Sequence, residues 1–374
     1  MSDATKQPGV SHWAENTTNI INPMIGIHNG SLASYSRIYS PLIMSNEWPK
    51  IGRLLFILFC CCFGSIMNGF FISSFFVERT LKRIGNTYLA CAGLADMLIT
   101  AGVMPVSAVV LLSGQWDNLL VCRTAQIAVE TATYAYSWFF LMVGVENFFR
   151  ICRTADYVIF IYLRIGLISI LIFCLSFTLA AVGVLLDLDY DYCARRSFGN
   201  PSFRICTSVL FYGVFTISTL ACLIATIMRL KRRAREEVQY KRSRLYKREY
   251  SFTASNLTAY VLFVVSWIPY WVIVNEFPST SDAQYYNTVW IGLFRSVFVS
   301  FIYGITNRNF RRAYGQLFNY CCCKSTLSSS FISRHRRPLE LQSTTGDTGV
   351  NIMDAPINSN SPHQDALILQ ETEL

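Results

Sequence analysis

The chain has 374 residues and a formal net charge of +9, and 52% of its residues are hydrophobic while only 15% are charged. A soluble domain of this size would carry more charge. The composition therefore excludes an ordinary soluble protein and indicates a chain that lies within a membrane.

Seven apolar stretches occur between residues 54 and 307. Four of them carry no charged residue, and the other three contain isolated charges. A transmembrane helix needs roughly 20 mostly apolar residues, so all seven are predicted to span. The expected fold is all-α, a seven-transmembrane helix bundle followed by a short amphipathic eighth helix. The stretches cover residues 54–77, 84–116, 124–149, 165–186, 205–228, 250–275 and 283–307.

Basic residues gather at one end of these stretches. Nine Lys and Arg residues lie between residues 231 and 249, in the connection between the fifth and sixth stretches. Basic residues near span ends face the cytoplasm, so the N-terminus is expected outside the cell. The positive charge thus marks the topology of a multi-pass plasma-membrane protein rather than nucleic-acid binding. The predicted parts are an extracellular segment (1–50), the bundle (51–306), the amphipathic helix (307–323) and a disordered cytoplasmic tail (324–374).

Two N-glycosylation motifs lie in the predicted extracellular segment, at Asn16 and Asn29. A third match, at Asn256, lies inside the sixth stretch and is expected to stay unmodified. Such motifs are common by chance, and the charge pattern is what gives the first two their weight.

The thirteen cysteines divide by compartment. Cys122 lies at the outer end of the third stretch and Cys193 in the following outer connection, an oxidising setting in which a disulfide persists. We predict that these two pair. Cys206 competes for the bond, but its short distance along the chain from the cytoplasmic Lys231 places it near the start of the fifth stretch.

The segment after the seventh stretch has an apolar face at helical spacing, with arginines alongside. This pattern predicts a helix that lies on membrane lipid under the inner leaflet. The residues of the apolar face are Phe310, Tyr314, Leu317 and Phe318. Three cysteines that end the helix are predicted palmitoylation sites, with unmodified thiols as the alternative. They are Cys321, Cys322 and Cys323.

The tail beyond these cysteines is polar and has no apolar periodicity, which is typical of disorder. Its last residues include Thr372 and Leu374, a pattern that fits strand addition to a PDZ domain. Motifs of this length are frequent by chance.

Short motifs in the spans resemble those of rhodopsin-like (class A) G-protein-coupled receptors. The run from Gly64 to Asn68 is similar to the Gly-x-x-Gly-Asn of span one, and Leu94-Ala95-Asp96 is similar to the core of the span-two motif. Trp116 stands six residues before Cys122, as in the first outer loop of that class.

The later spans extend the resemblance. The run from Phe263 to Pro269 resembles the Phe-x-x-Cys-Trp-x-Pro switch, with Ser266 in place of Cys. The run from Tyr303 to Arg312 looks like the end of span seven and the eighth helix of melatonin-type receptors, a group that includes insect moody-type orphans. The resemblance implies an extracellular ligand and a heterotrimeric G protein or arrestin as partners.

The resemblance also implies a set of switch residues, some of which depart from the family. Asn147 stands where the family has the arginine that contacts the G protein, and Arg150, one turn away, is the candidate to replace it. Of the family's Asn-Pro-x-x-Tyr, with Val299 and Ser300 at its first two positions, only Tyr303 is kept. These departures predict atypical coupling. The switch residues are Glu146, Asn147, Phe148, Trp267, Pro269 and Tyr303.

Three ionisable residues stand out within the spans, where an unpaired charge is costly and functional sites concentrate. They are Asp96, Glu130 and Arg295. In the resembling family the span-two aspartate binds sodium, but here Arg295 occupies one of the helper positions. We predict a salt bridge between Asp96 and Arg295 in place of sodium. The alternative is that Arg295 turns toward a wet outer cavity and serves as a counter-ion for a ligand. Glu130 could bind a cationic group or simply neutralise Arg295.

Aromatic residues at matching depth predict a ligand pocket with few polar anchors. An aromatic stripe at helical spacing is more often simple packing. The pocket candidates are Glu130, Thr133, Tyr134, Trp267, Tyr270, Trp271 and Asn275.

No hydrolase, kinase or metal signature occurs in the sequence, and the four histidines are scattered outside the spans. An enzyme, a cofactor and a metal are therefore not expected. The leading hypothesis is an orphan-type receptor that transmits an extracellular signal to a G protein or arrestin. The alternative is a non-signalling scaffold or decoy that acts through ligand or PDZ binding.

Overall fold

The computed structural model describes residues 40–82, 85–114, 118–152, 165–195, 197–276 and 280–322. Several predictions fall on residues outside these ranges: Asn16, Asn29, Trp116, Cys323, Thr372 and Leu374.

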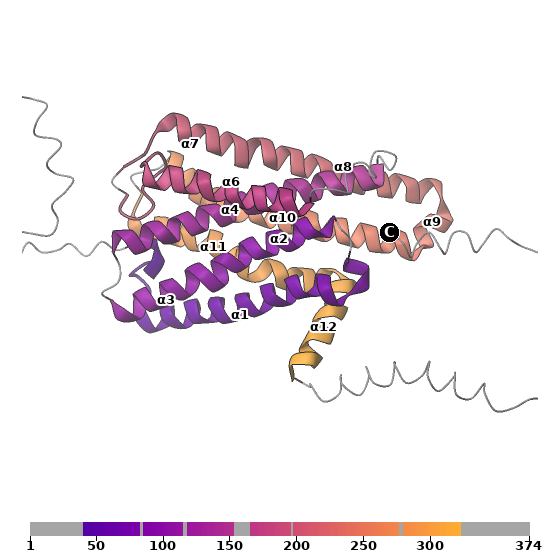
Figure 1. Ribbon diagram of the computed structural model, residues 1–374, viewed down its shortest axis with the longest axis horizontal. Helices are drawn as coiled ribbons and strands as arrows, with labels where there is room; N and C mark the ends of the chain where they lie inside the picture. The colour runs from indigo at the N-terminus through magenta and orange to yellow at the C-terminus, as the bar shows by residue number, and fades with distance from the viewer. Residues whose placement is uncertain are drawn as a thin grey trace, which may run out of the picture.

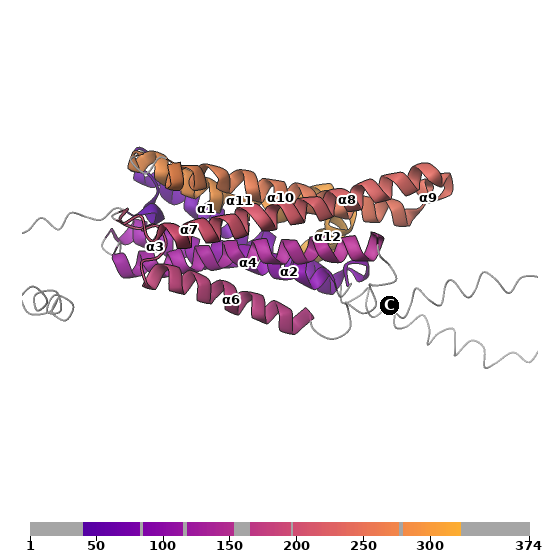
Figure 2. The same ribbon diagram turned by 90° about the horizontal axis from the view of Figure 1, so that it is seen from above.

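Long helices run side by side along the long axis of the molecule, and the turned view shows the same arrangement (Figures 1 and 2). Among the labelled helices of Figure 1, α12 leaves this direction and projects sideways from the bundle. The elements are η2 (Pro41–Ile43), α1 (Lys50–Val77), η3 (Arg79–Leu81), α2 (Asn86–Met97), η4 (Leu98–Val103), α3 (Met104–Ser113), α4 (Leu119–Cys152), α6 (Ile165–Leu185), α7 (Pro201–Ser208), η5 (Val209–Val214), α8 (Phe215–Glu236), α9 (Val238–Arg242), α10 (Arg244–Glu276), α11 (Asp282–Thr306) and α12 (Arg308–Cys322).

Within the described residues, six helical runs are long and apolar enough to cross a membrane. The helix that falls short of this is α4, which has 34 residues but carries many polar ones. It packs against α2, α6 and α8 at once, so most of its surface meets protein rather than lipid. A helix enclosed in this way need not be apolar all round, and α4 is the central helix of the predicted seven.

The two ends of the bundle differ in chemistry. One end, here called the disulfide end, carries the bond between Cys122 and Cys193. This confirms the predicted pairing, and Cys206 is free and exposed at the start of the fifth span. The opposite end, here called the basic end, carries α9 and α12 with their Lys and Arg residues.

The connection over residues 231–249 is more helical than its charges suggest. The helix α8 continues to Glu236, and α10 already begins at Arg244. Arg232 Nε donates to Glu236 Oε1 at 2.9 Å, one turn along α8. Such i, i+4 pairs add a few tenths of a kcal/mol to a helix, so the charges support the helical ends beyond the apolar run.

The predicted apolar face of α12 is partly packed against the bundle and partly exposed. Phe310 is fully buried and stacks on Phe71 of α1 at 5.1 Å between ring centroids. Tyr314 donates its hydroxyl to Ser300 O at 2.7 Å, whereas Phe318 is 59% exposed. The first half of the predicted apolar face therefore packs on the bundle, whereas Phe318 in the second half does not.

Candidate functional site

A cavity of about 670 Å³, including its open mouth, lies at the disulfide end between α4, the α7–η5 segment, α10 and the loop after α6. All seven residues that the sequence nominates line it: Glu130, Thr133, Tyr134, Trp267, Tyr270, Trp271 and Asn275. Other lining residues escaped sequence reasoning, among them Gln126, Asp189, Tyr192, Arg204 and Tyr212.

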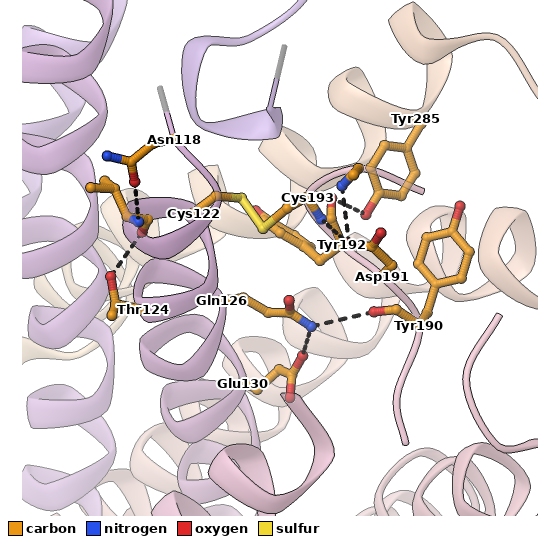
Figure 3. The surroundings of a disulfide bond; sticks show 12 residues. Asn118, Cys122, Thr124, Gln126, Glu130, Tyr190, Asp191, Tyr192, Cys193 and Tyr285 are labelled. Carbon is orange, nitrogen blue, oxygen red and sulfur yellow. Dashed lines mark hydrogen bonds between the residues drawn. A yellow bond between two sulfur atoms is a disulfide. The ribbon is translucent and has the colours of Figure 1, made fainter. Parts of the chain in front are cut away.

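The disulfide ties the loop after α6 to α4 (Figure 3), and this loop supplies Asp189 and Tyr192 to the cavity wall. Beside the bond, Tyr285 of α11 donates its hydroxyl to Tyr192 O at 3.2 Å. Gln126 Nε2 donates to Tyr190 O at 3.4 Å. The position of Tyr192 next to Cys193 is the signal in the sequence that marks this loop as part of the site.

Glu130 is the buried carboxylate of the cavity wall. Its Oε1 accepts a hydrogen bond from Gln126 Nε2 at 2.6 Å, as Figure 3 shows. Its Oε2 is buried and has no hydrogen-bond partner among the residues that the structure describes. An unpartnered buried carboxylate oxygen is costly, and a positively charged ligand group is the chemistry that would satisfy it.

Aromatic rings form much of the cavity wall. Trp267 and Tyr270 meet edge to face, with ring centroids 5.6 Å apart, and Tyr134 stacks on Phe211 at 4.4 Å. Ring faces attract cations through their quadrupole. A carboxylate set among such rings suits a compact organic cation.

Asn275 lines the cavity, but its amide is already engaged. Its Oδ1 accepts from Arg204 Nη2 at 2.8 Å, and its Nδ2 donates to Trp271 O at 2.9 Å. The same Arg204 nitrogen also donates to Val274 O at 2.9 Å. Asn275 therefore fastens α7 to α10 rather than presenting free polar atoms to the cavity.

Asp189, in the loop after α6, adds a second carboxylate to the wall. Its Oδ1 accepts from the Tyr190 backbone N–H at 2.7 Å. Burial raises the pKa of the Asp189 carboxyl, although this N–H bond, Arg204 and Tyr134 oppose the rise. With Arg204 nearby, Asp189 has a compensating cation that Glu130 lacks within the described residues.

Asp96 and Arg295 meet deep in the bundle, beneath the cavity. Arg295 Nη2 lies 2.5 Å from Asp96 Oδ1, and Nη1 lies 3.2 Å from Oδ2, so the pair is bidentate. Both side chains are 2% exposed. The guanidinium also lies 4.1 Å from the Tyr136 ring centroid and donates to Ser296 Oγ at 3.1 Å. Arg295 does not line the cavity.

A polar network beside this pair ties α1 to η4 and α11. Asn68 Nδ2 donates to Thr100 Oγ1 and to Ser296 O, both at 3.1 Å. Ser300 donates to Asn68 Oδ1 at 2.5 Å. The serine that stands in place of the family's proline therefore supplies a hydroxyl to this network.

Contacts between helices continue to the basic end. Tyr303 donates to Asn256 Oδ1 of α10 at 2.8 Å, and Asn256 is fully buried. At the end of α4, Arg150 Nη1 lies 2.6 Å from Glu249 Oε2 of α10.

Arg150 has two further partners on its own helix. Its Nε lies 3.2 Å from Glu146 Oε1, and its Nη2 donates to Asn147 Oδ1 at 2.7 Å. The arginine one turn beyond Asn147 thus contacts the carboxylates on both helices.

This helix bundle, with a disulfide over a cavity at one end and an arginine junction at the other, defines a seven-transmembrane receptor. Residues 67–303 match the family described as "7 transmembrane receptor (rhodopsin family)", and the chain belongs to that family.

Individual relatives are distant. The chain is 23% identical to the histamine H2 receptor of Rattus norvegicus over 72% of this chain and 77% of the relative. It is 20% identical to the melatonin receptor type 1A of Mus musculus, over 74% and 82%. It is also 20% identical to the alpha-1A adrenergic receptor of Oryzias latipes, over 78% and 71%.

Proposed function

We propose that this chain is a cell-surface receptor that binds a small organic cation at the disulfide end and signals to a heterotrimeric G protein or arrestin at the basic end. The disulfide suits an oxidising exterior, and Lys and Arg near the ends of spans suit the cytoplasm. The N-terminus then lies outside. Glycosylation at Asn16 and Asn29, palmitoylation at Cys321 to Cys323 and a PDZ partner stay predictions.

The observation that carries the proposal is the environment of Glu130. Arg295 is paired with Asp96, so it is not available to pair with Glu130. One Glu130 oxygen is left without a hydrogen bond inside an aromatic cavity. A protonated amine supplies both a charge and N–H donors to such a group.

The relatives divide over ligand charge. One is named for histamine, an amine, and one is named for melatonin, which is uncharged. A cavity with a buried carboxylate favours the amine class, because a neutral ligand would leave Glu130 unpaired.

The rival function is a decoy that binds a ligand without signalling, and it is favoured by Asn147 in place of arginine. The position of Arg150 supports signalling instead. It joins α4 to α10 across the basic end, and a junction between two helices is an element that a ligand can release to expose a binding surface.

The test is thermal unfolding of the full-length protein in detergent, with histamine and melatonin as probes. Histamine is expected to raise the melting temperature, with a stabilisation of about 2.7 kcal/mol at a hundredfold excess over its Kd, and melatonin is not. Glu130→Gln should abolish the shift. Glu47→Gln, which changes an exposed carboxylate near the same end, is the matched control.

A histamine shift that survives Glu130→Gln, or a shift with melatonin alone, would contradict the proposed cation site. Nucleotide exchange on added G protein then separates receptor from decoy. A receptor raises exchange when the probe binds, whereas a decoy binds without any rise.

A further inference from the structure

The segment before α1 is packed into the disulfide end of the bundle. Residues 40–45, here called the strap, are all buried, and Leu42 is only 1% exposed. The short turn η2 within the strap contacts α3 and α11, beside which its indigo ribbon lies in Figure 1. The cavity is lined by α4, α7, η5, α10 and the loop after α6, so the strap occupies the other half of this end.

Two buried donors from different helices hold the strap by its backbone. Trp290 Nε1 of α11 donates to Pro41 O at 2.7 Å. Arg53 Nη1 of α1 donates to Ile43 O at 3.1 Å, and the same nitrogen donates to Asn46 Oδ1 at 2.8 Å. Trp290 is 3% exposed and Arg53 is 9% exposed. Arg53 is a charged side chain buried at the end of an apolar helix. Its partners are carbonyl and amide oxygens of this segment, so its guanidinium binds the segment through charge-assisted hydrogen bonds.

The backbone conformation of the strap also depends on contacts with neighbouring residues. Met44 has a φ of 61°, which is unusual for a residue other than glycine. Such a conformation persists only where neighbouring contacts hold it. Met44 is itself 8% exposed, within the hydrophobic core.

The strap contacts α11, the helix that packs against Trp267 in the cavity wall. Two residues after Trp290, Gly292 lies so close to Trp267 that an added Cβ would come within 2.8 Å of the indole. Arg295, the partner of Asp96, lies further along the same helix. Trp290 thus lies on the same helix as the residue that packs on Trp267 and the arginine of the buried ion pair.

We propose that the strap is a tethered peptide that binds a niche between α1, α3 and α11 and holds α11 in the inactive position. The niche recognises two backbone carbonyls and an aliphatic side chain, and its ligand class is a short apolar peptide supplied by the chain itself. Release of the strap frees α11 and raises basal signalling, a consequence that rests on the proposed function.

The binding half of the proposal is tested by cysteine accessibility on intact cells. Leu42→Cys is placed in a Cys206→Ser background and treated with a membrane-impermeant maleimide, with Trp48→Cys as the exposed reference. Leu42→Cys should react far more slowly than the reference. Adding Trp290→Phe, which keeps a ring but removes the N–H, or Arg53→Gln should accelerate labelling about tenfold. Arg123→Gln, which breaks an exposed ion pair at the same end, should not.

The regulatory half is tested by basal nucleotide exchange on added G protein. Trp290→Phe and Arg53→Gln should each raise it about fivefold, and Glu249→Gln, which acts at the basic end, is measured beside them. Labelling of Leu42→Cys at the rate of the reference overturns the strap. If only Glu249→Gln raises exchange, the strap is a static cover and the regulatory inference fails while the proposed function stands. If no variant raises basal exchange, the regulatory inference also fails, and the probe-driven exchange described above decides separately whether the chain signals.

Discussion

Asp96 and Arg295 place two opposite charges where the resembling family keeps a carboxylate for sodium. The guanidinium makes two contacts with that carboxylate and a third with Ser296. It also faces the Tyr136 ring. The aspartate that binds sodium in the resembling family is thus engaged here by a cation belonging to the chain.

A double-mutant cycle tests this pair. Arg295→Leu or Asp96→Asn alone leaves an uncompensated buried polar or charged group and should cost about 3–5 kcal/mol, whereas the double change should be milder. Thermal unfolding in detergent measures all three. Losing the exposed pair of Arg123 and Asp187 should cost only about 0–1 kcal/mol.

Sodium supplies an independent control for the same pair. Replacing sodium chloride by a large organic chloride salt should leave the melting temperature of the native protein unchanged, because Arg295 already neutralises Asp96. Losses that simply add in the double variant, or a sodium-dependent gain in stability, would show that the pair does not act as the cation site.

Asp189 gives a second prediction, on pH dependence. Its pKa is raised by burial, so folding disfavours the ionised form, and stability falls as pH rises from the ordinary Asp value of about 3.9 through the raised folded value. Asp189→Asn removes this penalty and can keep the bond from the Tyr190 N–H. The variant should unfold at a higher temperature than the native protein at neutral pH, and the gap should close as pH falls to about 4.

The control for Asp189 is Asp187→Asn, since Asp187 is an exposed carboxylate in the same loop. The control is measured at the same pH values. A gap for Asp189→Asn that widens on acidification would reverse the sign and refute burial as the dominant cause.

At the scale of elements, the apolar runs predicted the helices, because the side chains along a span must either face lipid or be buried against other helices. The runs did not predict where helices continue beyond the membrane. Residues 231–249 are largely helical because charged side chains such as Arg232 and Glu236 pair along the helix. The polar sequence of α4 likewise makes sense only once its helical neighbours are known.

The cavity shows the same division between local and long-range information. Glu130, Thr133 and Tyr134 lie three and four residues apart, so the helical period alone places them on one face. Asp189 and Arg204 could not be predicted in this way. They reach the cavity through a loop that the disulfide pins and through the start of the fifth span, and no local period encodes that placement.

The junction between α4 and α10 yields a prediction for these elements as a pair. Glu249→Gln weakens the ion pair with Arg150, which holds the basic end together. Basal nucleotide exchange should rise about fivefold or more, because hydrogen bonds to charged groups are worth about 1.5–3 kcal/mol. Asn147→Arg, which restores the family's arginine, should also raise exchange. Glu237→Gln changes an exposed ion pair at the same end and is the control.

Equal effects of Glu249→Gln and Glu237→Gln would mean that charge at the basic end matters, but the junction does not. If the native protein already drives nucleotide exchange as strongly as ordinary receptors do, Asn147 does not weaken coupling.

At the scale of the whole molecule, the charge pattern, the disulfide and the cavity distinguish the same two ends of the bundle. The carboxylates of the cavity lie at the disulfide end, and the Lys and Arg of α8, α9 and α12 lie at the other. The sequence predicted this polarity because membrane insertion acts on charges near span ends. The strap could not be predicted, because its binding groups, Arg53 and Trp290, come from helices far apart in the chain.

The bond between Cys122 and Cys193 joins residues separated by 71 positions and fixes the loop over the cavity. Its removal should cost about 4 kcal/mol on the chain-entropy estimate for a loop of this length. Cys122→Ser, Cys193→Ser and the double change should lower the melting temperature and surface expression to the same extent, because each removes the same bond. Cys206→Ser should change neither, since Cys206 is free and exposed. A larger loss in the double variant, or a comparable loss with Cys206→Ser, would mean that these thiols act separately and that another bond holds the loop.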